Sequence, residues 1–285
     1  MKHLTIAGAA LAIAGFSLPQ SAEAASYFVR PFIQVGAGGL IDGLQQNGAT
    51  NASQNFGTNF QSTVDLDDGT VKARTNIPSA QSNGQSGASF GERVAFSPDA
   101  AGTNVSFSFD FDGTIEVSDL LNGPLATGYS AFVFANLFVY DSTAGATYQN
   151  FTSLGGALIS RTFAQDYGTS SGATPSNTFF DVDRTLSGSI TVEANKRYDV
   201  FASLSIAAAT NQNDISIMMD FMNTGTFGID ADPGVTYTSS SGVFLDSTGV
   251  TPPPSPVPVP AALPLLLGGL GLLGFVSRRR RAAAA

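Results

Sequence analysis

Cysteine and tryptophan are absent from the 285-residue sequence, and its single histidine is His3. Catalysis by Ser-His-Asp or Cys-His groups requires a histidine, and zinc and copper sites are ordinarily built from His and Cys. A phosphate-binding loop of the strand–loop–helix kind is also missing. Because the chain beyond its first residues lacks the groups for these common chemistries, we expect it not to be an enzyme.

The first 24 residues have the layout of a secretory signal peptide. Lys2 and His3 supply positive charge, residues 4–16 are apolar, and Ala22 and Ala24 form an A-x-A cleavage site. We expect signal peptidase to cut after Ala24 and the remainder to be exported. An exported chain of this size without cysteine is more typical of bacteria than of small eukaryotic secreted modules, which are rich in disulfides.

The C-terminus carries a short apolar run followed by a basic cluster. Residues 261–276 contain 16 positions without a charge, and a helix of that length spans about 24 Å against a bilayer core of about 30 Å. The positive-inside rule places the cluster that follows on the cytoplasmic side of the inner membrane; its members are Arg278, Arg279, Arg280 and Arg281. The run can serve as a permanent transmembrane anchor, as a removable sorting tag, or as a buried helix with a basic end.

The residues before this run distinguish the three interpretations. Residues 251–260 hold six of the 14 prolines, and 251–256 are expected to form a Pro-rich linker. The next five, Val257, Pro258, Val259, Pro260 and Ala261, are followed by the Leu/Gly-rich run and the arginines. Together, residues 257–285 resemble the PEP-CTERM class of bacterial sorting signals in its VPLPA variant, with Val259 in place of the usual leucine.

The resemblance implies a route for the protein. An exosortase, a membrane-embedded cysteine protease, would recognise Val257 to Ala261 while the span is held in the inner membrane. It would then remove the span and release the protein toward the cell surface of a Gram-negative bacterium. Proteins with such a signal are commonly associated with exopolysaccharide and biofilm production. The resemblance covers only the tail and says nothing of the fold in front of it.

The exported region, residues 25–250, is strongly acidic. Between residues 25 and 256 there are 8 Lys and Arg against 21 Asp and Glu, a net charge of −13. Nucleic acid and anionic lipid are therefore poor partners. An acidic polysaccharide would need bridging cations to approach a surface of the same sign.

Hydrophobic periodicity in this region is of the strand kind. Along residues 105–117, Val105, Phe107, Phe109 and Phe111 alternate with Ser and Asp until Gly113, where we expect a turn or bulge. Residues 129–140 are apolar on both alternating faces, which indicates a central strand. The other expected strands are 27–35, 89–96, 189–192, 198–207, 215–221, 235–238 and 243–245. Residues 45–59 and 79–89, rich in Gln, Asn, Ser and Gly, are expected to be loops.

This pattern predicts an all-β fold: an antiparallel β-sandwich of jelly-roll or Greek-key type, followed by a single C-terminal transmembrane helix. We expect no cofactor. A structural calcium ion is the one alternative, because Asp pairs of the D-x-D kind occur in turns and strands, where oxygen ligands suit calcium. The pairs are Asp65/Asp67, Asp110/Asp112, Asp181/Asp183 and Asp230/Asp232.

The sequence favours a structural or adhesive role at the cell surface, in contact with extracellular polysaccharide. The alternative is a carbohydrate-binding or carbohydrate-active sandwich, a lyase or hydrolase working through Asp with Tyr, Lys or Arg. A deep cleft with Asp220 among converging side chains would favour the enzyme. Only seven Tyr and no Trp are available as aromatic sugar platforms, and the 22 Phe are expected to lie mostly in the core.

Overall fold

The computed structural model describes residues 27–36, 45–78, 83–97, 100–119, 129–168, 178–210, 214–233 and 235–246. They belong to a compact unit, Met1–Pro252, and a second unit, Pro253–Ala285, lies outside the described residues. The expected signal peptide, Pro-rich linker, sorting motif and arginine cluster also fall outside them. The described residues include no helix of the length and apolarity that a membrane span requires.

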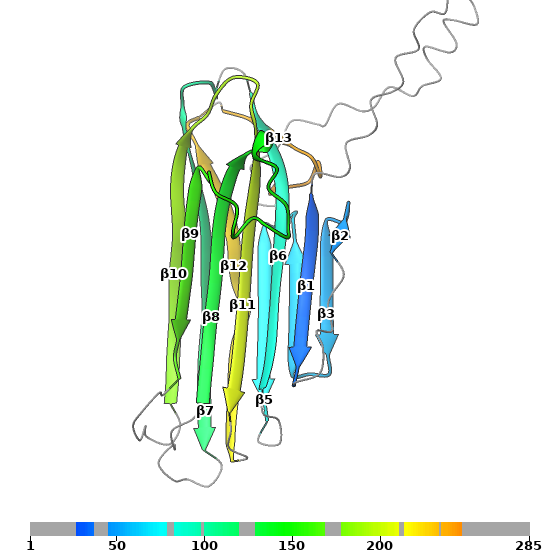
Figure 1. Cartoon of the computed structure of the whole chain (residues 1–285), viewed down its shortest axis with the longest axis vertical. Coiled ribbons are helices and arrows are strands. Elements are labelled where there is room, and N and C mark those ends of the chain that lie inside the picture. Colours follow the sequence, from blue (N-terminus) through cyan, green and yellow to red (C-terminus); the bar gives the residue numbers. More distant parts are fainter. Residues whose placement is uncertain are drawn as a thin grey trace, which may run out of the picture. The chain divides into compact units, whose positions relative to one another are not determined.

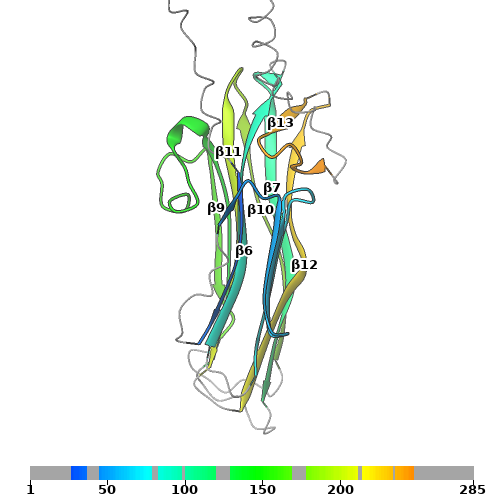
Figure 2. The same cartoon turned by 90° about the vertical axis from the view of Figure 1, so that its right-hand side faces the viewer.

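The fold is an antiparallel β-sandwich of two sheets, which confirms the all-β part of the predicted fold class (Figures 1 and 2). The expected transmembrane helix lies outside the described residues. Sheet A has the order β2-β1-β6-β11-β8-β9, with β13 also paired to β6. Its strands are β1 (Phe28–Val35), β2 (Gln46–Asn47), β6 (Asn83–Phe96), β8 (Tyr129–Asp141), β9 (Ile159–Asp166), β11 (Arg197–Thr210) and β13 (Tyr237–Ser239). Sheet B has the order β10-β7-β12-β5-β4-β3. Its strands are β3 (Asn51–Phe56), β4 (Phe60–Asp65), β5 (Thr70–Ile77), β7 (Asn104–Asp119), β10 (Thr178–Thr191) and β12 (Ile215–Ala231).

Eight consecutive strands, β5 to β12, define the topology of the sandwich. From β5 to β12 the chain builds β5-β12-β7-β10 in sheet B and β6-β11-β8-β9 in sheet A, which is the strand order of a jelly roll. The preceding strands widen both sheets on the same side: β1 and β2 extend sheet A beyond β6, while β3 and β4 extend sheet B beyond β5. Every strand pairing in the described residues is antiparallel.

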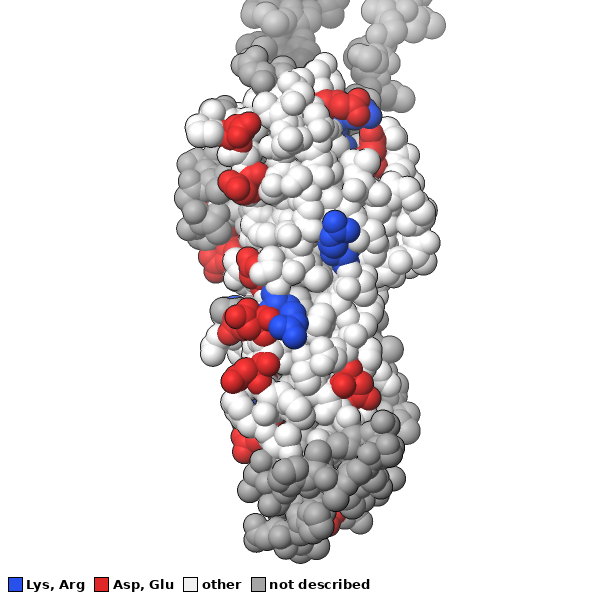
Figure 3. Space-filling model, turned by 90° about the vertical axis from the view of Figure 1, so that its left-hand side faces the viewer, with Lys and Arg blue, Asp and Glu red and all other residues white. Residues whose placement is uncertain are grey.

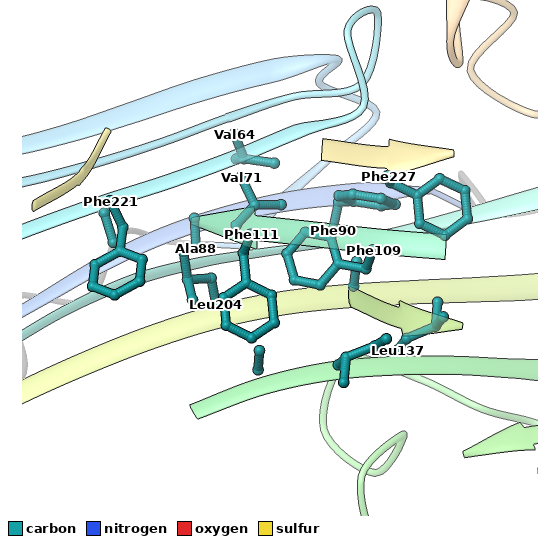
Figure 4. Packing of buried hydrophobic residues seen from close by; sticks show 14 of the residues in the cluster. Val64, Val71, Ala88, Phe90, Phe109, Phe111, Leu137, Leu204, Phe221 and Phe227 are labelled. Atoms are coloured by element: carbon teal, nitrogen blue, oxygen red, sulfur yellow. The ribbon is translucent and has the colours of Figure 1, made fainter. Parts of the chain in front are cut away.

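The core lies between the sheets and is rich in phenylalanine (Figure 4). Phe107, Phe109 and Phe111 on β7 are buried, as their period of two predicts. Phe90 on β6 packs edge-on against Phe227 on β12 and against Phe244, with ring centroids 5.6 Å apart in each case. Because burying one such side chain contributes about 2 to 3 kcal/mol, this layer is the main source of stability.

The segment after β12 adds residues to the core without forming the second of its two expected strands. Phe244 and Leu245 are buried, but residues 243–245 form a turn in which Leu245 has a φ of 64°. Tyr237 donates a hydrogen bond to the Phe244 carbonyl at 3.0 Å, and the Leu245 amide bonds to the Leu66 carbonyl at 3.0 Å. The expected strand at 243–245 is therefore wrong, because tertiary packing holds these residues in a turn.

The two expected loops are also corrected. Residues 45–59 contain β2 and β3, strands whose side chains are mostly polar because they lie at sheet edges. Residues 83–89 belong to β6, where Gly84 and Gly87 make room for the rings of Phe60 and Phe32. No turn occurs at Gly113: β7 runs through it, the ring of Phe221 fills the space beside it, and the register shift falls in β12 instead.

Candidate functional site

The outer faces of the two sheets differ in charge. On sheet B, outward positions of β7, β10 and β12 carry many carboxylates, and Figure 3 shows acidic side chains in a column along one side of the molecule. These carboxylates are Asp110, Asp112, Glu116, Asp181, Asp183, Asp220 and Asp230. On sheet A the acids of the outward face are few and engaged. Asp166 accepts hydrogen bonds from Ser130 and from two backbone amides, and Asp199 is paired with Arg93.

Of the Asp pairs named from the sequence, only Asp112 and the pair Asp181/Asp183 come together, at an open pocket of about 330 Å³ between β7 and β10. Asp65 accepts a hydrogen bond from the Asp67 amide at 2.9 Å, so this pair shapes the turn between β4 and β5. Asp110 accepts from Thr185 across the β7–β10 ladder, and Asp112 lies directly opposite Asp183. Within the described ranges, no three His, Cys, Asp or Glu side chains are grouped so that they could hold a metal ion. The expected calcium ligands therefore do not form a three-acid site there.

Asp220 has a local role on sheet B. Its carboxylate lies 3.3 Å from Arg74 and also accepts from the Met222 amide, beside the irregular part of β12. The ion pair is partly exposed, so it contributes little to stability. None of the pockets found among the described residues is lined by Asp220. The cleft that would favour an enzyme is therefore not found at this residue.

The outward face of sheet A has small side chains along its two central strands and aromatic ones on either side. We call the small positions, together with their aromatic neighbours, the sheet A strip. It consists of Gln85, Gly87 and Ser89 on β6, Ser203, Ser205 and Ala207 on β11, Phe32 on β1, and Phe132 and Phe134 on β8. The strand register places Phe32, Gly87, Ser205 and Phe134 in one row across the sheet.

The three aromatic residues of the strip are held by contacts on the outward face of sheet A. A Cβ at Gly87 would stand 2.5 Å from Cζ of Phe32, so the ring of Phe32 lies over the glycine. Phe132 and Phe134 are stacked with centroids 6.4 Å apart and an angle of 20° between their planes. All three rings are half-buried. A half-buried ring packs part of its surface against the protein and can offer the rest to a ligand.

Between the aromatics lie hydroxyl and amide groups that hydrogen bonds hold in place. Gln85 donates to Ser205 at 2.7 Å. Asn136 donates to Ser203 at 2.9 Å and accepts from Thr162 at 3.0 Å. Each of these groups has further donor or acceptor capacity, because an amide offers two N–H groups and a hydroxyl two lone pairs. The arrangement can bind a ligand rich in hydroxyl groups without first being ordered.

A pocket lies at each end of the strip. The distal pocket has a volume of about 280 Å³ and is lined by Gln34, Asn83, Gln85, Ser130 and Ala207, among others. The capped pocket, about 150 Å³, lies at the other end; its lining includes Gln45, Asn47, Arg93, Tyr148 and Asp199. Both are smaller than a typical drug-sized pocket of about 300 to 1,000 Å³. Each pocket can hold the end or a branch of an extended ligand better than it can hold an entire ligand molecule.

The capped pocket takes its name from residues 142–158, which fold over the outward face of sheet A between β8 and β9 (Figures 1 and 2). This cap begins with the 3-10 helix η2 (Ser142–Ala144) and packs Phe151 flat against Phe201 at 5.0 Å. The buried Tyr140 hydroxyl donates to the carbonyls of Phe151 and Leu154. The cap is thus fixed to the sheet at several points.

Charged groups at the capped end are held in defined contacts. Arg93 binds Asp199 through two nitrogens, with distances of 2.6 and 3.2 Å. The guanidinium of Arg30 lies 4.2 Å from the ring centroid of Tyr148 on the cap and 5.4 Å from that of Phe32. Such contacts keep an arginine in one orientation while its charge remains.

Sequence reasoning singled out none of the strip residues. Phe32 and Phe134 are separated by about a hundred positions and share no motif. Their common row depends on the pairing of β1, β6, β11 and β8, which only the tertiary structure supplies. The one available signal was the alternation inside 129–140, where both faces are apolar: one face packs between the sheets, and on the other Phe138 and Tyr140 are buried under residues 142–158 while Phe132 and Phe134 stay half-buried.

No known protein-family model matches the chain, and no curated protein does. Among solved structures, one match is TmCBM61 in complex with beta-1,4-galactotriose, at 10% identity over 65% of this chain and 90% of that chain, with a TM-score of 0.21. Another is infectious bursal disease virus, Gx strain, at 10% identity over 90% of this chain and 70% of that chain, with a TM-score of 0.14. At TM-scores this low, neither likeness bears on the function of this protein.

Proposed function

We propose that this protein is an exported, non-enzymatic adhesive protein that binds extracellular polysaccharide along the sheet A strip. The observation that carries the proposal is the set of half-buried aromatic rings on the outward face of sheet A beside preorganised hydroxyl and amide groups. Sugar rings combine apolar C–H faces, which pack on aromatic faces, with hydroxyl groups, which exchange hydrogen bonds with Ser, Asn and Gln. The strip offers both kinds of contact side by side.

The shape of the surface favours a polymer over a small ligand. From Gly91 to Asn83, β6 covers eight steps, which correspond to about 26 Å at 3.3 Å per residue. A pocket at each end and a continuous row of small residues between them suit an extended chain. Binding without catalysis is proposed for the strip because glycoside hydrolysis needs two carboxyl groups about 5 to 10 Å apart, and Asp199 in the capped pocket is already held by Arg93. The facing carboxylates Asp112 and Asp183 lie on the other sheet, away from the strip.

Export and sorting complete the proposal. The signal peptide would direct the protein out of the cytoplasm, and an exosortase would cut near Val257 to Ala261 and release it at the surface of a Gram-negative cell. The resemblance of the tail to sorting signals supports this part, and its association with exopolysaccharide agrees with a ligand of that class. The protein would then serve as a structural or adhesive component of a biofilm matrix.

The proposal is tested by polysaccharide binding of the full-length protein and of a Phe32→Ala variant. Loss of one aromatic contact of about 1 kcal/mol should weaken binding about fivefold. Phe179→Ala is the matched control, because Phe179 is 58% exposed on the opposite sheet. Thermal melting of each variant shows that it is folded. The proposal would be overturned if both substitutions weakened polysaccharide binding equally. It would also be overturned if the parent protein and both variants all failed to bind.

A further inference from the structure

Three of the eight basic residues between positions 25 and 256 lie on the outward side of sheet A: Arg30, opposite Ser89 in the middle of β6, and Arg93 and Arg197 near the β13 end. Lys196 lies beside them but is bound to Asp141 and Glu193 at 3.1 and 2.9 Å. The carboxylates, by contrast, are concentrated on sheet B. Although residues 25–256 carry a strongly negative net charge, the outward faces of the two sheets differ in charge. The more basic face is that of sheet A, which carries the strip.

Two of these arginines line another pocket. This arginine pocket, about 220 Å³, lies across β11, β6 and β13 and is lined by Arg93, Ala95, Arg197, Thr238 and Ser240, among others. The register places Arg197 on one side of Ala95 and Thr238 on the other. Adjacent strands are about 4.8 Å apart, so the backbones at Arg197 and Thr238 are about 10 Å apart. Ala95 lies between them, and its side chain ends at Cβ. The space above Ala95 is open because alanine does not fill it.

The pocket is suited to an anion in its chemistry as well as its shape. A guanidinium presents five N–H donors in a plane that matches both oxygens of a carboxylate. Arg93 directs two of its nitrogens to Asp199, which fixes the guanidinium at the border of the pocket. Arg197 is exposed and Thr238 half-buried. Thr238 donates its hydroxyl to the Ala95 carbonyl at 3.4 Å, so an anion over Ala95 would meet chiefly the arginine from β11.

The arginine pocket is continuous with the proposed polysaccharide site, because Arg93 lines both it and the capped pocket. Building on the proposed function, we propose that the polysaccharide is an acidic one, and that Arg197 and Arg93 bind its carboxylate groups directly in the arginine pocket. The acids of sheet B lie on the far side of a packed sandwich. At physiological salt the Debye length is about 8 Å, so solvent screens much of their repulsion. The net charge alone led us to expect cations that bridge the protein and an acidic polysaccharide, but direct contacts to arginine make such cations unnecessary.

The test compares acidic polysaccharides with their own neutral forms. The full-length protein is titrated with alginate, polygalacturonate, hyaluronan and xanthan, each before and after chemical reduction of its carboxyl groups, in buffer with and without EDTA. We expect at least one acidic polymer to bind about tenfold more tightly than its reduced form. Its affinity should fall with rising salt, because charge contacts between exposed groups are screened.

Arg197→Gln should weaken binding of the acidic polymer about five- to tenfold and leave binding of the reduced polymer unchanged. Lys72→Gln is the control, since it removes one positive charge from the outward face of sheet B. Equal affinity for acidic and reduced polymers, a silent Arg197→Gln, or loss of binding in EDTA would each overturn the direct anion contact while leaving the proposed function intact. Failure of every polymer in both forms would instead overturn the proposed function, and this inference with it.

Discussion

Glu92 on β6 is a carboxyl group in the interior of the sandwich. It is 1% exposed, and one carboxyl oxygen, Oε1, accepts hydrogen bonds from the backbone amides of Arg93, Ser240 and Ser241. The other oxygen, Oε2, has no hydrogen-bond partner among the described residues. Burial raises the pKa of Glu92 from 4.5 to about 7, and the hydrogen bonds oppose this only in part. The residue thus joins β6 to the segment after β13 while remaining mostly protonated below neutral pH.

This shift predicts a pH-dependent stability. Between about pH 4.5 and pH 7 the unfolded chain loses a proton that the folded protein keeps at Glu92, so the free energy of unfolding falls as pH rises through this window. The expected total is about 3 kcal/mol. Urea denaturation of the full-length protein and of Glu92→Gln at pH 4.5 to 8 measures it. The Gln variant should lack this component of the slope, and identical slopes for the two proteins would contradict the assignment.

Among the elements, the cap formed by residues 142–158 is attached to β8 in part through one buried hydroxyl group. The Tyr140 hydroxyl donates to the Phe151 and Leu154 carbonyls at 2.6 and 2.9 Å, and Tyr140 is fully buried. Removing a donor from buried carbonyls costs about 1 to 3 kcal/mol. The cap holds Tyr148 at the capped pocket and over Arg30, so its attachment also bears on the proposed site.

Tyr140→Phe should therefore loosen the cap without unfolding the sandwich. Amide hydrogen exchange across residues 145–157 should accelerate about tenfold or more, while exchange in β7 and β12 stays near its original rate. Tyr237→Phe removes a comparable buried hydroxyl bond to the Phe244 carbonyl, outside the cap, and is the control. Uniform acceleration over the whole sandwich, or none in the cap, would show that Tyr140 does not hold this element in particular.

Some strands were predictable from the sequence and others were not. β8 was predicted although both of its faces are apolar, whereas β5 was missed although one of its faces is buried. β7 followed from Val105, Phe107, Phe109 and Phe111, which alternate with polar residues and are all buried. β3, with the sequence NASQNF, was not predicted, because an edge strand with mostly polar side chains has no hydrophobic period. β6 was foreseen only from Ser89, although it begins at Asn83, because glycines there replace the apolar signal. The strip itself depends on register across four strands, which no local pattern reveals.

At the scale of the whole molecule, the expected tail determines where the jelly roll is presented. If Val257 to Ala261 form a sorting motif, intact-mass measurement of protein recovered from the cell surface should show a C-terminus near Ala261 and an N-terminus at Ala25. The same measurement on cells lacking the exosortase should return the full tail. Surface protein that still carries Arg278 to Arg281 would contradict processing and favour a permanent anchor.

The central claim is that polysaccharide lies on the outward face of sheet A. Hydroxyl-radical footprinting of the full-length protein with and without a bound polysaccharide tests it most directly, because phenylalanine oxidation reports the exposure of individual rings. The account predicts protection of Phe32, Phe132 and Phe134. Phe179 on β10 and Phe56 on β3, which are 58% and 47% exposed, should remain as reactive as before. Protection of Phe179 or Phe56 with no change at the three strip residues would contradict the claim.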